Sequence, residues 1–263
     1  MASSATGSIG GHDHRWLITL VIATSALAWF VLWRFGASPY VHYMHHAHLH
    51  APPIDSGLLG ASIFVSGWTL MTVAMMLPTS GPLLAVFSTV ARQRSDRAFL
   101  VMLVVAGYLA SWAAFGLLAY GGAVWFRAAT ARSGWLSDNG WILGAGTLLV
   151  AGAYQFTALK HQCLDRCRSP FSFVVEHWTG EHHRRQALWL GLHHGLFCVG
   201  CCWTLMLLMF PFGAGNLGWM LLLGTVMAVE KNFPWGRAMA KPVGVVLLAL
   251  GLLVTLRVDT RLW

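Results

Sequence analysis

Residues 189–210 read W-L-G-L-H-H-G-L-F-C-V-G-C-C-W-T-L-M-L-L-M-F. This stretch is about as long as a helix must be to cross the hydrocarbon core of a bilayer. Residues three and four apart share one helix face, so the spacing predicts a row of nitrogen and sulfur donors along this segment. The donors are His194, Cys198, Cys202, Met206 and Met209, with Cys201 beside them. Such groups select soft metals, Cu(I) above all, although buried Cys and Met also pack as ordinary apolar residues.

The composition indicates an all-α protein, a polytopic helical membrane bundle. Of the 263 residues, 57% are hydrophobic and only 10% are charged, whereas a soluble domain typically has about 25% charged residues. About seven transmembrane helices are expected, at residues 16–33, 58–91, 98–120, 141–159, 189–210, 217–229 and 243–256. The net charge of +8 fits the surplus of Lys and Arg in cytoplasmic loops, and no basic run has the pattern of a nucleic-acid platform.

The second predicted span is broken by P-T-S-G-P at residues 78–82. Proline interrupts the helical hydrogen bonds and glycine loosens the backbone. Broken helices in membranes are tolerated where they are buried in protein or line a cavity. Met71 and Met75 lie one turn apart just before the break, and we favour them over the adjacent Met76 as metal ligands. The alternative is a simple proline kink whose methionines only pack.

A histidine-rich tract follows the first span, at residues 40–55. Closely spaced imidazoles are a compositional signal of metal binding, and neutral imidazole suits copper or zinc. The spacing fits no rigid zinc geometry, so we interpret the tract as an outer capture loop, or else as a polar loop with fortuitous histidines. Its donors are His42, Met44, His45, His46, His48 and His50.

The longest polar segment, residues 160–186, is predicted to be a cytoplasmic loop. It contains Cys163 and Cys167, which share one face if the preceding helix continues, and neighbouring arginines favour the metal-binding thiolate. The alternative is two unpaired cytoplasmic cysteines. His161 and Glu230 are additional candidate ligands. Glu230 could instead be half of a surface ion pair.

The Lys and Arg residues are distributed unevenly over the loops, which predicts a cytoplasmic amino terminus and, with seven spans, a periplasmic carboxyl terminus. Residues 1–15 are then a disordered cytoplasmic tail and residues 16–263 a single transmembrane domain. The histidine-rich tract faces outward, and Cys163 and Cys167 face inward. This order suggests a route between them through the methionines and the central cysteines, in either direction.

Five motifs give the chain a resemblance to a known family. They are A-M-M-L-P at residues 74–78, C-L-D-R-C-R-S-P at 163–170, G-L-F-C-V-G-C-C-W at 195–203, N-L-G-W-M at 216–220 and E-K at 230–231. The chain resembles the bacterial predicted metal-binding integral membrane proteins of unknown function. The resemblance implies metal handling in the bacterial inner membrane, with copper as the suspected ion. That family often has Met at the position of Gly215, so no ligand role is carried over to that turn.

Copper transfer is therefore the expected function, by a transporter or by a membrane chaperone that feeds a copper enzyme. Zinc is the alternative ion, because it binds Cys and His but not Met. Two other functions stay open: a membrane thiol–disulfide redox protein, and an accessory structural subunit of a larger membrane complex. Cys198, Cys201 and Cys202 on one straight helix are poorly placed to pair, so a redox role needs a cysteine from another helix. No motif of a hydrolytic enzyme appears, and beyond the lipid bilayer no nucleic acid is expected as a partner.

Overall fold

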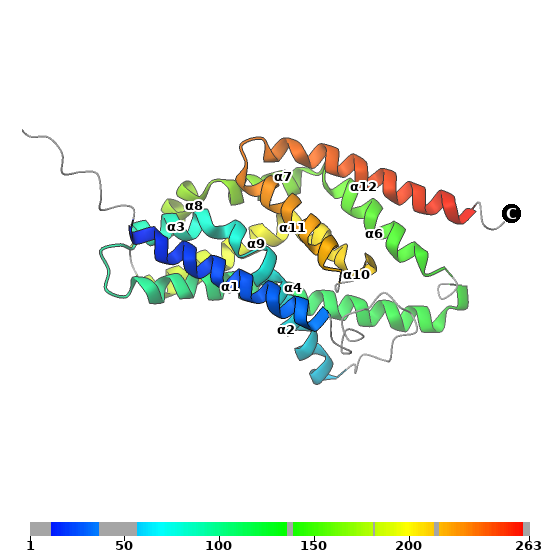
Figure 1. The fold of residues 1–263 in the computed structure, drawn as a ribbon, viewed down its shortest axis with the longest axis horizontal. Coiled ribbons are helices and arrows are strands. Elements are labelled where there is room, and N and C mark those ends of the chain that lie inside the picture. The colour runs from blue at the N-terminus through cyan, green and yellow to red at the C-terminus, as the bar shows by residue number, and fades with distance from the viewer. Residues whose placement is uncertain (1–11, 37–56, 136–138, 181, 213–215, 260–263) are drawn as a thin grey trace, which may run out of the picture.

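All regular elements in the described part of the chain are helices, which confirms the all-α prediction. The computed structural model describes residues 12–36, 57–135, 139–180, 182–212 and 216–259. The start of α1 and the end of α12 lie at opposite ends of the longest axis (Figure 1). The elements are α1 (His12–Gly36), α2 (Leu58–Met75), the short 3-10 helix η2 (Pro78–Ser80), α3 (Gly81–Val90), α4 (Arg97–Arg132), α6 (Trp141–Tyr154), α7 (Ala158–Arg168), α8 (Pro170–His177), α9 (His183–Leu207), α10 (Met209–Phe212), α11 (Leu217–Asn232) and α12 (Gly236–Asp259).

The number of helices that could span a membrane is lower than the seven expected from sequence. Among the described residues, α1, α2, α4, α9 and α12 are each long and apolar enough to cross, and α6 and α7 add a sixth span only if this pair, bent by 66°, is counted as one. Helix α11 has 16 residues, which is short of the roughly 20 that a bilayer core requires. The expected count was too high because apolar composition alone does not show how long each helix runs or where it bends.

Two predicted boundaries are also corrected. Residues 160–186 were expected to form a loop, but most of α7, all of α8 and the start of α9 lie there. Thr157 explains the start of α7, because its side chain accepts a hydrogen bond from the Lys160 backbone amide at 3.3 Å and so caps the helix. The predicted tail at residues 1–15 ends earlier, because α1 begins at His12, while the apolar stretch of α1 starts at Trp16 as predicted. The rest of the predicted tail and the histidine-rich tract at residues 40–55 lie outside the described residues.

The predicted break in the second apolar segment is confirmed. Helix α2 ends at Met75, η2 follows at Pro78, and α3 begins at Gly81. Proline at position 78 cannot donate to the carbonyl of Ala74, four residues earlier. That carbonyl is satisfied by α1 instead, since Ser25 Oγ donates to it at 2.8 Å and Trp29 Nε1 at 3.1 Å. The break is thus buried against α1, which removes the cost of unsatisfied backbone groups in an apolar interior.

Helices α4 and α9 pack closely enough for their backbones to touch. A Cβ atom added to Gly107 of α4 would collide with the carbonyl oxygen of Leu188, and one added to Gly191 of α9 would collide with that of Val104. Ser111 Oγ donates to the carbonyl of Leu192 at 2.9 Å across the same interface. Small residues at a helix interface permit this approach, which is the usual way in which apolar helices associate in lipid. The contact fixes the rotation of α9 and therefore the direction of its cysteines.

We expect Gly107→Ala to destabilise the protein by about 1–3 kcal/mol, because the added methyl group meets backbone that cannot rotate away. Gly121→Ala on the same helix is the control, since a Cβ atom there has nothing within 4 Å. The measurement is the free energy of unfolding in detergent micelles, from a denaturant titration. Equal stability of the two variants would contradict the close approach of α4 and α9.

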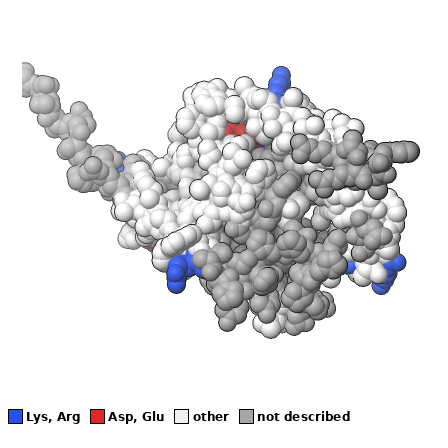
Figure 2. Space-filling view, turned by 45° about the vertical axis from the view of Figure 1, so that its right-hand side comes forward, with Lys and Arg blue, Asp and Glu red and all other residues white. Residues whose placement is uncertain are grey.

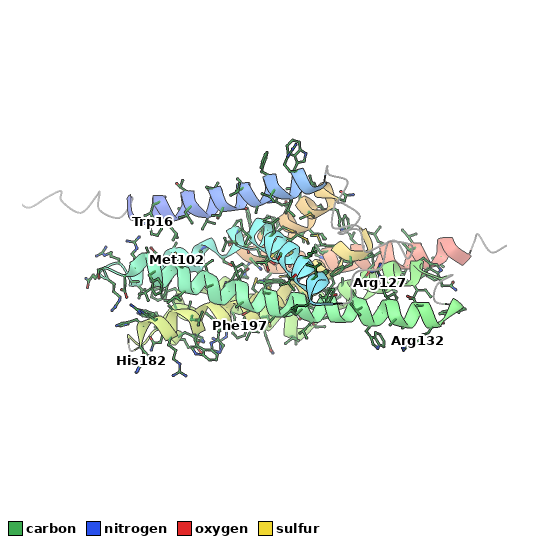
Figure 3. The ribbon with its side chains drawn as sticks, turned by 90° about the horizontal axis from the view of Figure 1, so that it is seen from below. Trp16, Met102, Arg127, Arg132, His182 and Phe197 are labelled. Carbon is green, nitrogen blue, oxygen red and sulfur yellow. The ribbon has the colours of Figure 1, made fainter. Side chains whose placement is uncertain are left out.

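The outer surface of the bundle is apolar. Leu58, Leu118 and Trp125 are 89%, 74% and 71% exposed. Figure 2 shows a face on which the described atoms are almost all uncharged, with the few Lys and Arg side chains at its margins. Figure 3 places Trp16 and His182 at one end of the bundle and Arg127 and Arg132 at the other. Helices α1 and α9 therefore begin at the same end, as the sequence-based topology requires.

Candidate metal centre

Three cysteines of α9 lie in the interior of the bundle. Cys198, Cys201 and Cys202 are each at most 1% exposed, and all are free thiols. The thiols of Cys201 and Cys202 donate to the carbonyl oxygen of Cys198 at 3.1 and 2.9 Å. These bonds hold both sulfur atoms close to the turn that carries Cys198. The predicted gathering of the three cysteines on a buried part of α9 is thus present.

Met76 is the methionine that reaches these cysteines. It directly follows the last residue of α2, and its side chain is fully buried. Its sulfur lies 3.9 Å from Cys202 Sγ. Its carbonyl accepts hydrogen bonds from Thr79 Oγ1 at 2.7 Å and from Tyr108 OH at 3.4 Å. Helical spacing favours Met71 and Met75 over Met76, but it is Met76 whose sulfur lies beside Cys202. Met76 is the C-cap residue of α2, and its amide still donates to the Thr72 carbonyl at 2.8 Å.

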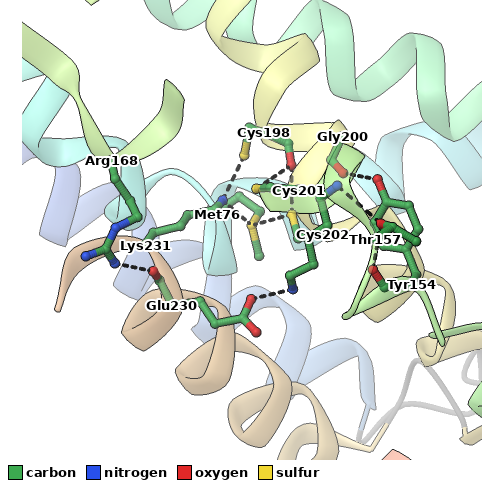
Figure 4. Close-up of polar contacts among 11 residues, drawn as sticks. Met76, Tyr154, Thr157, Arg168, Cys198, Gly200, Cys201, Cys202, Glu230 and Lys231 are labelled. Atoms are coloured by element: carbon green, nitrogen blue, oxygen red, sulfur yellow. Dashed lines mark hydrogen bonds and ion pairs between the residues drawn. The ribbon is translucent and has the colours of Figure 1, made fainter. Parts of the chain in front are cut away.

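A lysine side chain enters the sulfur cluster from α11. Lys231 is 7% exposed, and its Nζ lies 2.9 Å from Cys198 Sγ and 3.4 Å from Met76 Sδ (Figure 4). Tyr108 OH lies 3.0 Å from the same Cys198 sulfur. From the sequence, Lys231 is part of the E-K motif at residues 230–231 and is not expected in the metal site. The signal that could have identified it is a charged residue within an apolar segment, which is a functional hypothesis by default.

Helix α7 places two further cysteines against the other side of the α9 row. A Cβ atom added to Gly200 would lie 2.6 Å from Cys163 Sγ, so this sulfur rests on the α9 backbone. Cys167, one turn later, is partly buried and packs against the hydrophobic cluster that contains the three α9 cysteines. Because α7 is a helix, the predicted shared face of Cys163 and Cys167 is formed. The two cysteines of α7 therefore lie beside the cysteine row of α9.

The other sequence-predicted ligands lie at differing distances from this cluster. The four methionines predicted as ligands lie in the same buried hydrophobic cluster as the cysteines. Within the described residues, no hydrogen bond joins them to a cysteine sulfur. They are Met71, Met75, Met206 and Met209. Met75 packs towards α11, where its side chain lies against Gly224.

Of the candidate histidines in the described residues, His194 lies beside the sulfur cluster. His194 is 3% exposed and stacks on Tyr108 with ring centroids 5.8 Å apart. Its Nδ1 atom has no hydrogen-bond partner among the described residues. His194 therefore packs on Tyr108, the residue whose hydroxyl contacts Cys198. His161 lies on α7, and its Nδ1 atom likewise has no partner in the described part of the chain.

Glu230 forms an ion pair, but a buried one. Its Oε2 lies 2.7 Å from Lys160 Nζ, and the two side chains are 2% and 0% exposed. Arg168 binds the carbonyl of Glu230 at 2.6 Å and that of Pro234 at 2.9 Å, which caps the end of α11. These contacts join α7, with its two cysteines, to the turn that carries Lys231. Glu230 is therefore placed to position the cluster. The alternative to its ligand role, an ion pair, is present, but it is buried and not at the surface.

The donor set fits a soft ion better than zinc. In the described part of the chain, no group of three or more His, Cys, Asp or Glu side chains is arranged to hold a metal, so the closed tetrahedral set that Zn(II) prefers is missing there. Two sulfurs that each lie about 2.3 Å from one ion are at most about 4.6 Å apart. The separation of 3.9 Å between Cys202 Sγ and Met76 Sδ satisfies that condition. Thiols and a thioether in a dry interior are the ligand types of Cu(I).

The fold is an all-helical bundle with apolar helices of membrane-spanning length, and its core contains a buried Cys–Met cluster. These features together define a class of helical proteins suited to soft metals. Within that class the chain belongs to the PpoB2 family, described as a copper chaperone, whose match covers residues 65–254. The match includes all five cysteines, Met76 and Lys231, and it shows a function related to copper. No curated protein and no solved structure matches the chain.

Proposed function

We propose that this protein is a membrane-embedded chaperone that holds one Cu(I) ion among Cys198, Cys202 and Met76 and transfers it to a partner. The observation that carries the proposal is the meeting of thiols from α9 with the thioether of Met76 inside a dry core. A bare ion is very costly in such an environment, whereas thioethers and metal-bound thiolates are not. The description of the family as a copper chaperone supports the choice of ion.

Helices that are long and apolar enough to cross a bilayer support the membrane location. Helix α4 has 36 residues, about 54 Å at 1.5 Å per residue, which exceeds the roughly 30 Å of a bilayer core. We propose insertion in a bacterial inner membrane, with the amino terminus cytoplasmic and the carboxyl terminus periplasmic. The positions of the first and last helices at opposite ends of the long axis support opposite locations of the termini.

A route for copper follows from this orientation. The histidine-rich tract would capture the ion outside, and Met71, Met75, Met206 and Met209 would pass it towards the central cysteines. Cys163 and Cys167 would receive it on the cytoplasmic side, or the ion would move in reverse. The support is that these four methionines and the α9 cysteines share one buried cluster, with Cys167 packed against it. The receiving partner is a copper enzyme or another membrane subunit.

The test is the metal content of detergent-solubilised protein purified under reducing conditions, followed by transfer to a Cu(I) chelator. We expect close to one copper per chain, and transfer that is faster than release from free thiols at the same concentration. Metal-free protein that also rejects added Cu(I) would refute the proposal. If such protein is also redox-silent and copurifies with a larger complex, the structural-subunit alternative would be favoured.

Met76→Leu is expected to weaken Cu(I) binding by about tenfold or more, since the thioether is a ligand and even partners that only orient ligands are worth 10–100-fold. Leucine keeps the volume and apolar character of methionine, so the fold should be retained. Met220→Leu is the matched control, because Met220 is also fully buried in the same cluster and the sulfur-to-sulfur hydrogen bond of Cys202 is made with Met76. Competition with a Cu(I) chelator measures both. Equal affinities would remove Met76 from the ligand set.

Thiol–disulfide exchange is a second candidate function, and one observation favours it. Cys167 of α7 packs against the buried cluster that contains Cys201 of α9, so the redox function has the cysteine from another helix that it requires. Formation of this disulfide would release two protons and give two electrons to an acceptor, for instance two Cu(II) ions reduced to Cu(I). Thiol alkylation before and after addition of Cu(II), followed by mass spectrometry, detects a Cys167–Cys201 bond. Five alkylated thiols under both conditions would exclude it.

A further inference from the structure

Lys231 is a buried cation whose hydrogen-bond partners among the described residues are sulfur and hydroxyl groups. Its ammonium lies 2.9 Å from Cys198 Sγ, 3.4 Å from Met76 Sδ and 3.4 Å from Thr79 Oγ1. The neighbouring carboxylate of Glu230 is bound to Lys160. No carboxylate forms an ion pair with Lys231 in the part of the chain that the structure describes. An ammonium buried in this way is costly unless a nearby group carries negative charge.

Metal binding supplies that negative charge, because thiols bind metals as thiolates. With Cys198 and Cys202 as thiolates, the two sulfurs carry a charge of −2, and Lys231 contributes +1. A monovalent ion then brings the buried cluster to zero net charge. A divalent ion leaves +1 in an interior where an uncompensated charge is strongly disfavoured.

We propose that Lys231 is a specificity-determining residue that restricts this cluster to monovalent soft ions, Cu(I) and its analogue Ag(I), and excludes Zn(II) by charge. The inference rests on the proposed function, since it takes Cys198 and Cys202 as the thiolate ligands. In this proposal two effects select the ion. The positive charge of Lys231 beside the ligands disfavours divalent ions, and the sulfur donors favour soft ions. A cluster with the same sulfurs and no ammonium would be neutral with Zn(II) and would carry −1 with Cu(I).

The test compares the affinities of Cu(I), Ag(I) and Zn(II) for the detergent-solubilised full chain, each measured against a chelator of known affinity. Lys231→Leu removes the charge without adding a metal donor, and Lys231→Arg keeps the charge. We expect Lys231→Leu to raise the ratio of Zn(II) affinity to Cu(I) affinity by at least about 30-fold, the lower range for loss of one partner of a buried charge pair. Ag(I) should follow Cu(I), and Lys231→Arg should keep the wild-type ratio within about threefold.

An unchanged ratio in a folded Lys231→Leu protein that still binds Cu(I) would overturn the inference and leave the proposed function intact. Wild-type protein that binds no Cu(I) would refute the proposed function itself.

Thr79→Asp gives a second test that retains Lys231, because its carboxylate neutralises the ammonium at the position of Thr79 Oγ1. Thr79→Asn is the uncharged control. If the net charge sets the selectivity, Thr79→Asp should bind Cu(I) more weakly and Zn(II) more tightly than the wild-type protein. Thr79→Asn should bind both ions as the wild-type protein does. Tighter Zn(II) binding with unchanged Cu(I) affinity would mean that the carboxylate acts only as a new zinc ligand, which would count against the role of Lys231.

Discussion

The Cys198→Ser, Cys202→Ser double variant is expected to contain less than about a tenth of the copper of the wild-type protein after purification under reducing conditions. Both thiols are buried, and each contacts a further member of the cluster: Lys231 for Cys198 and Met76 for Cys202. Serine retains the shape but cannot supply the thiolate that a soft ion requires. The expected loss of affinity exceeds about 100-fold, because changes to groups that merely orient ligands already cost 10–100-fold.

The control for this variant is Thr204→Val, a buried position on the same helix that removes a hydroxyl and leaves every sulfur in place. Copper is quantified by elemental analysis on the monodisperse fraction from size exclusion, so that an unfolded variant is not mistaken for an apo protein. Full copper occupancy in the folded double variant would place the metal elsewhere in the chain. The α7 cysteines, Cys163 and Cys167, would then be the next positions to change.

Glu230→Ala is expected to destabilise the protein by about 3–5 kcal/mol, because it leaves Lys160 as a fully buried charge without its partner. Lys160→Met should cost a similar amount by leaving the carboxylate unpaired. The double variant Lys160→Met, Glu230→Leu should be more stable than either single variant, since a buried ion pair can often be replaced by apolar side chains at little cost. Denaturant titration in micelles gives the free energy of unfolding for each member of this cycle.

The surface pair formed by Arg166 and Glu176 is the matched control. Its atoms lie 2.6 Å apart, but the side chains are 51% and 52% exposed. Glu176→Ala should therefore cost only about 0–1 kcal/mol. A loss that small in Glu230→Ala would mean that the Lys160–Glu230 pair is hydrated in the native protein. It would also weaken the argument that this pair fixes α7 and its cysteines against α11.

The local features of the fold could be predicted from the sequence. Apolar runs identified most of the long helices, and the proline at position 78 identified the break after α2. The helix boundaries were predicted less well. After α6 the chain bends by 66° and continues as helix α7, whose composition is polar. Residues 158–168 form a helix through the cap at Thr157 and through packing on α9, neither of which is visible as hydrophobic periodicity.

The candidate site was predicted in part. The three cysteines of α9 were correctly expected to be gathered in the interior, since all are at most 1% exposed. Met76 was ranked below Met71 and Met75, because those two lie one helical turn apart on a shared face and Met76 does not share it. The contact of Met76 with Cys202 depends on packing between segments distant in sequence. Lys231 was not recognised as part of the cluster, because a residue at a helix end is usually solvated.

The sequence alone determined that the chain is helical, apolar and interrupted at residue 78, and that its sulfur donors recur along one helix. These properties depend on residues that are neighbours in the chain. The tertiary structure decided which donors meet. The close contact of Gly107 and Gly191 sets the rotation of α9, and the contacts of the Ala74 carbonyl with α1 set the direction of the break that carries Met76. The approach of Lys231 to Cys198 depends on packing between helices distant in sequence, so no local pattern could specify it.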